Sequence, residues 1–157
     1  MKYLIALCLC FFSLSGFGQH LELSRLKSLI GKPVVIIADS LAKKGWKVHP
    51  ELSGKKDNQL YQTFSFGTLK AEQVKALAWF RIHADNGIIN QLYYQLTGKE
   101  QYNLMLAEIK KDGAERKDVQ DIEANQISTY YVSPEYIYQT IAGSGNYTVM
   151  VTANKQP

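Results

Sequence analysis

Two segments of this chain follow the same pattern, and their similarity limits the possible fold more than any other feature. One, LIGKPVVIIADSLAKKGW, begins at Leu29, and the other, LTGKEQYNLMLAEIKKDG, begins at Leu96. Each opens with Leu-x-Gly-Lys and closes on a lysine-bearing turn with a glycine, Gly45 or Gly113. Counted back from these glycines, apolar residues recur at i, i+3, i+4 and i+7, which is the buried stripe of an amphipathic helix. The matching sets are Val34, Ile37, Ala38 and Leu41, and Tyr102, Met105, Leu106 and Ile109.

The local residues also favour a helix in each segment. The β-branched run Val34–Ile37 is typical of a buried strand and lowers helix propensity by about a few tenths of a kcal/mol per residue. Burial of the apolar stripe outweighs this cost, at roughly 1.5–3 kcal/mol per large side chain. Pro33 suits a first helical position, and Thr97 with Glu100 predicts a capping box in the second helix.

Strands are predicted after each helix, because β-branched and aromatic residues partly alternate with polar ones there. The turn Asp85-Asn86-Gly87 predicts a hairpin in the first half, and Gly143-Ser144-Gly145 predicts one in the second. A short helix is expected at Leu21–Ile30, and additional short strands at Trp46–His49 and Ala114–Val119. The main predicted strands are Asn58–Gly67, Ala76–Ala84, Ile88–Thr97, Asn125–Pro134, Glu135–Ala142 and Asn146–Ala153.

The same order of helix, glycine, Asn-Gln pair and hairpin occurs twice, as expected of a duplicated unit. We therefore expect an α+β domain over residues 19–157, built from two tandem units at about 21–96 and 97–157. Helices on one face of an antiparallel sheet leave the other face open to solvent.

This order of elements resembles the tandem-repeat proteins typified by β-lactamase inhibitor protein. The resemblance covers nearly all of residues 19–157 and implies one continuous sheet with a concave open face. The small outer-membrane assembly lipoproteins built on the same helix-then-sheet unit are a similar match. Residues 19–157 contain no cysteine, so the disulfides usual in the inhibitor family have no counterpart.

Residues 1–18 have the three-part plan of a secretory signal peptide. Lys2 is basic, the run to Leu14 is almost wholly apolar, and Gly16-Phe17-Gly18 offers small residues for cleavage. Cys8 and Cys10 lie inside this segment and lack a lipoprotein pattern. We expect an exported protein, periplasmic or secreted, with no transmembrane segment after cleavage. A net charge of +4, spread over scattered lysine pairs, does not favour nucleic acid as a partner.

The sequence shows no recognised catalytic motif, neither His-Glu-x-x-His, Gly-x-Ser-x-Gly nor a phosphate-binding glycine loop. Its three histidines, His20, His49 and His83, lack the close spacing of zinc ligands. The acidic residues from Asp112 to Glu123 lack a calcium-loop pattern and are expected on a solvated edge. Neither an enzyme nor a cofactor or metal site is therefore predicted.

Alternation along the predicted strands places aromatic and basic residues together on the open face. Tyrosine, tryptophan and arginine often dominate protein interfaces, because they bury large areas and retain a polar group. Tyrosines also form strands without any partner, so a purely structural role is the alternative for these residues. The predicted binding residues are Tyr61, Trp79, Arg81, His83, Tyr93, Tyr136 and Tyr138.

The sequence thus favours a non-catalytic exported protein that binds, and inhibits or neutralises, another protein through this face. The alternative is an envelope-associated protein that binds glycan, peptidoglycan or lipid with the same aromatic residues. An enzyme would require Arg81, His83 and a carboxylate to meet in a closed pocket.

Overall fold

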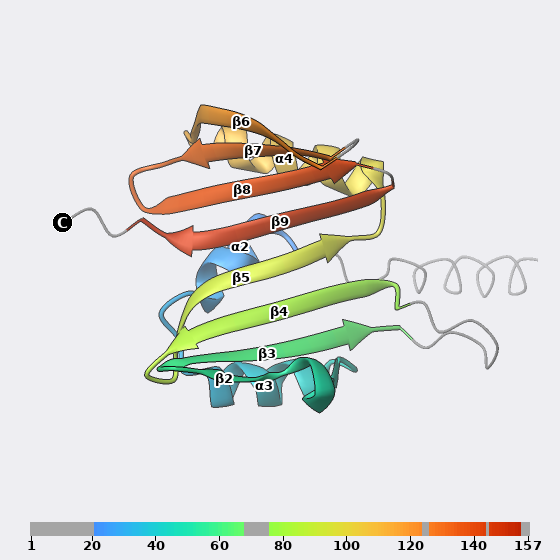
Figure 1. Ribbon diagram of the computed structural model, residues 1–157, viewed down its shortest axis with the longest axis vertical. Coiled ribbons are helices and arrows are strands. Elements are labelled where there is room, and N and C mark those ends of the chain that lie inside the picture. The colour runs from blue at the N-terminus through green and yellow to red at the C-terminus, as the bar shows by residue number, and fades with distance from the viewer. Residues whose placement is uncertain (1–20, 68–75, 124–125, 144, 155–157) are drawn as a thin grey trace, which may run out of the picture.

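The computed structural model describes residues 21–67, 76–123, 126–143 and 145–154, with side chains described outside 121–123. Within these residues, three α-helices accompany one antiparallel sheet of nine strands (Figure 1). The α+β class predicted from the sequence is confirmed. The serine of the predicted Gly143-Ser144-Gly145 turn lies outside the described residues.

The first half of the chain forms one half of the sheet, from an outer edge to the centre. Helix α3 leads into an interrupted edge strand, formed by β1 and β2, and then into three longer strands. The elements are α2 (Leu23–Leu29), α3 (Val34–Lys43), β1 (Lys47–Val48), the 3-10 turn η2 (Pro50–Leu52), β2 (Gly54–Lys56), β3 (Gln59–Phe66), β4 (Ala78–Asp85) and β5 (Ile88–Leu96).

The second half of the chain forms the other half of the sheet. Its elements are α4 (Lys99–Lys111), β6 (Glu115–Glu123), β7 (Gln126–Val132), β8 (Tyr136–Gly143) and β9 (Asn146–Ala153). The strand order is β1-β3-β4-β5-β9-β8-β7-β6, with β2 also paired to β3. The last strand of each half therefore meets the other at the centre, where Tyr93 pairs with Met150.

The helices pack on one face of this sheet, behind the strands in the view of Figure 1. Both predicted helical stripes point into the core. In α3 the residues Val34, Ile37 and Leu41 are buried, and in α4 Met105 and Ile109 are buried. Packing of the stripe therefore overrides the strand propensity of the β-branched run. Facing them are Phe64, Phe80, Ile82, Leu92, Tyr94, Val149 and Val151.

The helix ends are only partly as predicted. Gly45 and Gly113 have φ of +85° and +76°, the left-handed conformation that ends many helices. The predicted capping box is wrong, because α4 begins at Lys99 after Gly98 and has no side-chain cap. The Thr97 N–H instead donates to Oε1 of Gln101 at 3.2 Å.

The predicted hairpin joins β4 to β5 through Asn86 and Gly87, which both have positive φ. Asparagine and glycine tolerate this conformation best, which is why the pair marks such turns. The register then shifts between His83 and Ala84. This irregularity lets Ile89 enter the core, where it is 1% exposed.

Candidate functional site

The face of the sheet opposite the helices carries most of the predicted binding residues. On β4, Trp79, Arg81 and His83 point to this open face, because Ala78, Phe80, Ile82 and Ala84 alternate with them and are buried in the core. Directly opposed residues of an antiparallel pair share a face. Arg81 is opposed by Thr63 on one side and by Tyr93 on the other.

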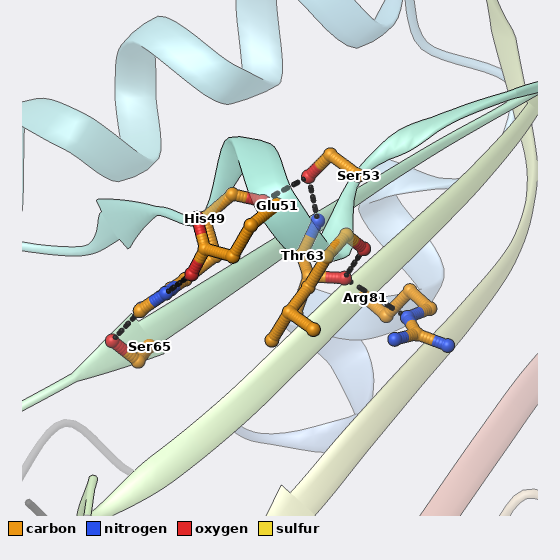
Figure 2. Close-up of polar contacts among 7 residues, drawn as sticks. His49, Glu51, Ser53, Thr63, Ser65 and Arg81 are labelled. Atoms are coloured by element: carbon orange, nitrogen blue, oxygen red, sulfur yellow. Dashed lines mark hydrogen bonds and ion pairs between the residues drawn. The ribbon is translucent and has the colours of Figure 1, made fainter.

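A short turn folds over one end of this open face. The edge strand along β3 is interrupted after Val48 and resumes at Gly54, and residues 49–53 between them include η2. Thr63 and Ser65 beneath this turn are only 4% and 7% exposed, although they lie on the open face. The turn therefore covers this part of β3, next to β4, and Figure 2 shows the polar contacts that join the turn to the strand.

Hydrogen bonds from β3 hold the turn in place. The Thr63 N–H donates to Oγ of Ser53 at 3.0 Å, and Oγ1 of Thr63 donates to the carbonyl of Leu52 at 2.7 Å. Oγ of Ser53 donates in turn to the carbonyl of His49 at 2.7 Å. These bonds satisfy backbone groups that the interrupted strand leaves unpaired.

A second set of contacts joins His49 to Glu51 and Ser65. Nδ1 of His49 lies 2.7 Å from Oε1 of Glu51, and Nε2 lies 2.7 Å from Oγ of Ser65. Because a carboxylate can only accept, Nδ1–H donates to Glu51, and in this tautomer Nε2 accepts the Ser65 hydroxyl. The pKa of Glu51 is lowered, first by a backbone hydrogen bond and then by His49.

The turn and the sheet together enclose a cleft of about 480 Å³. Leu52 forms one wall from η2, and it is 41% exposed. Aromatic rings, a guanidinium and amide and hydroxyl groups form the rest. The lining residues are Leu52, Thr63, Trp79, Phe80, Arg81, His83, Tyr93, Gln95 and Thr148.

Electrostatics in the cleft are set by Arg81. Its Nε–H donates to Oγ1 of Thr63 at 2.9 Å. The pKa of His83 is lowered, first by burial and then by the charge of Arg81. Burial raises the pKa of the Tyr93 hydroxyl, and Arg81 opposes that effect. At neutral pH the cleft therefore holds one fixed cation among neutral rings.

The order Ser65–His49–Glu51 is also that of a serine nucleophile, its base and an orienting carboxylate. Acyl transfer further needs donors aimed at a developing oxyanion. Ser65, however, lies within a regular strand paired on both sides, to Lys47 and to Trp79. Its backbone amide pairs within the sheet and does not lie in a strained turn. Ser65, His49 and Glu51 therefore serve best to hold residues 49–53 onto β3.

Five of the seven predicted residues share the open face. Trp79, Arg81, His83 and Tyr93 line the cleft. Tyr61 lies beside it, with its ring centroid 6.1 Å from that of His83. Its hydroxyl also covers Gly54, where an added Cβ would approach to 2.8 Å. His83 and Tyr93 are in ring contact at 5.2 Å.

The predicted placement of Tyr136 and Tyr138 is wrong, because both lie on the helix side of β8. Tyr138 is 0% exposed. Its hydroxyl donates to Oδ2 of Asp112, just after α4, at 2.5 Å. Asp112 also accepts from Nζ of Lys27 on α2, at 2.5 Å, and this ammonium lies 4.8 Å from the ring centroid of Tyr136. Polar groups brought by two helices thus make the tyrosines suitable core residues.

Alternation alone could not resolve this point, because both sides of β8 carry large apolar groups. Ile137 and Ile141, expected in the core, face the open side opposite Thr152 and Thr148. Sequence reasoning also missed Leu52, Thr63, Gln95 and Thr148 as cleft residues. The open-face alternation could have indicated Thr63 and Gln95, whereas Leu52 enters only through η2.

The described residues contain no cluster of three or more side chains suited to hold a metal ion. Among the same residues, no helix is both long and apolar enough to cross a lipid bilayer. Comparison of the chain with protein-family models, with curated proteins and with solved structures gave no match.

Proposed function

We propose that this chain is an exported, non-catalytic binding protein and that another protein docks on its open face at the cleft. The observation that carries this proposal is the cleft itself, where Trp79, Arg81 and Tyr93 stand together beside the exposed Leu52. Interface residues that contribute most to affinity are typically such aromatic and arginine side chains in partly desolvated pockets.

The rest of the open face favours a partner larger than a small molecule. Next to the cleft, β9 and β8 present Met150, Ile137 and Ile141 on the same side of the sheet. The solvent face of an antiparallel sheet is usually polar, and these apolar residues, interspersed with Gln139, Thr148 and Thr152, offer contact to another macromolecule. A protein that fills the cleft would also cover this neighbouring strip.

Export is proposed on the sequence of residues 1–18, which lie outside the described residues. The mass of the protein recovered from the periplasm or culture medium tests it. We expect a chain that begins at Gln19, and an intact Met1 would refute cleavage.

We also propose that the two halves descend from one duplicated unit. The strand order supports this, because each half runs from an outer edge strand to a central strand, β5 or β9. The relation to the tandem-repeat proteins typified by β-lactamase inhibitor protein remains a proposal of the same kind. Superposition of residues 34–96 on residues 99–153 tests the duplication, and unrelated helix-to-sheet angles would refute it.

Affinity capture tests the binding function. The immobilised protein should retain a partner from an envelope extract, and the Trp79→Ala variant should retain little of it. Leu104→Ala is the matched control, because Leu104 is 54% exposed but lies on α4, away from the open face. Treatment of the extract with protease should remove the partner. If the bound material survives protease, the partner is a glycan or lipid of the envelope instead.

A further inference from the structure

We propose that Arg81 recognises a carboxylate, so that the partner inserts an acidic side chain, flanked by an apolar one, into the cleft. This inference rests on the proposed function and specifies the chemistry of the docking segment.

The position of Arg81 is fixed from within the protein. Its Nε–H is bound to Thr63, and Thr63 is itself bound to the backbone of Leu52. The two terminal amino groups of the guanidinium take part in no ion pair or hydrogen bond recorded among the described residues. Arg81 is also exposed, so a ligand can reach these donors.

No lining residue of the cleft carries a carboxylate. Glu51, in the neighbouring turn, is bound to His49 at 2.7 Å. An arginine offers a planar pair of donors that matches the two oxygens of a carboxylate. The cleft therefore presents a positive charge that the described part of the chain leaves without a counter-ion.

The walls indicate what accompanies the carboxylate. Leu52 and Trp79 both line the cleft and offer apolar contact. The ring of Trp79 contacts that of His49, with ring centroids 5.0 Å apart. A segment with an acidic residue next to a leucine would match both the guanidinium and these walls, and its flanks would meet Met150 and Ile141.

Two peptides that differ in one group test the inference. Acetyl-Leu-Glu-Leu-amide and acetyl-Leu-Gln-Leu-amide are titrated into the full domain, and binding is followed by ¹H–¹⁵N spectra of Nε–H of Arg81 and of the Trp79 indole. We expect the glutamate peptide to bind about fivefold more tightly, which is the upper end of the range for an exposed ion pair. Salt should reduce this preference.

Arg81→Gln should abolish the preference while the peptides still shift the Trp79 signal. Arg25→Gln is the matched control, because Arg25 is an exposed arginine on α2, and it should keep the preference. A folded Arg81→Gln protein is verified by its unchanged Trp46 indole signal, since Trp46 is buried.

Equal affinity of the two peptides at the cleft would overturn the inference and leave the proposed function standing. Failure of both peptides to shift Trp79 or Arg81 would overturn it as well. If acetate alone binds as tightly as the glutamate peptide, Arg81 holds an adventitious anion only. If N-acetylmuramic acid binds more tightly than the peptide, a protein partner is refuted in favour of an acidic glycan.

Discussion

Replacement of Tyr138 by phenylalanine tests how the helices are fixed to the second half of the sheet. The variant keeps the buried ring and removes one hydroxyl, which donates to Asp112. Hydrogen bonds to charged groups contribute about 1.5–3 kcal/mol. Asp112 retains Lys27, and its side chain is 25% exposed, so water can replace part of the lost contact. We therefore expect a loss near the lower limit, about 1.5 kcal/mol.

Urea unfolding followed by circular dichroism measures this loss. Tyr130→Phe is the matched control. Tyr130 is half-buried on β7, and its hydroxyl makes no hydrogen bond recorded among the described residues. A domain of this size should lose about 5 °C in melting temperature for the expected change. A loss below about 0.5 kcal/mol, or one equal to that of Tyr130→Phe, would refute the role assigned to the hydroxyl.

The same variant has a pH signature. Burial acts to raise the pKa of Asp112, but hydrogen bonds from Lys27 and Tyr138 and the charge of Lys27 outweigh it and hold the pKa below 3.8. A group with a lowered pKa stabilises the fold above its unfolded pKa, and this contribution is lost as pH falls through the folded value. Tyr138→Phe should therefore lose less stability than the wild type between about pH 4 and pH 2. Parallel stability curves in this range would contradict the assignment.

Three further changes test the remaining geometry. Arg81→Gln should raise the pKa of His83 by removing its repulsion while burial still holds it below 6.5; a ¹H NMR titration that shows no rise would contradict this cause. Gly113→Ala should cost about 1 kcal/mol in urea unfolding, because φ is +76° while an added Cβ meets nothing within 4 Å; an unchanged midpoint would show that the backbone relaxes freely. Thr63→Val should increase hydrogen exchange or proteolysis within residues 49–53, since it removes the bond to Leu52; equal rates would show that other contacts hold the turn.

The sequence predicts the parts of this fold that depend on local periodicity. The stripe of Val34, Ile37 and Leu41 identifies α3 despite its β-branched residues, because one face must be buried. Asn86-Gly87 identifies its hairpin, because few other pairs accept positive φ at both positions. Alternation also places Trp79, Arg81 and His83 correctly on the open face, since Phe80 and Ile82 between them mark the core side.

Features that depend on contacts distant in sequence could not be predicted. Tyr138 is buried because Asp112 and Lys27, brought by two helices, provide polar partners on the core side. The sequence of β8 alone does not indicate these partners. The cleft needs η2, and no apolar periodicity in the sequence indicates this turn. Side-chain hydrogen bonds of Thr63 and Ser53 hold it in place. Tyr138 therefore belongs to the core, while Leu52 joins the candidate site.

Quenching of tryptophan fluorescence by iodide tests the central claim most directly. The chain has two tryptophans; Trp46 is 3% exposed, so quenching reports the cleft residue Trp79. We expect iodide to quench the free protein and to lose this effect once the captured partner saturates it. Unchanged quenching in the saturated complex would mean that the partner docks elsewhere, and the cleft would not be the binding site.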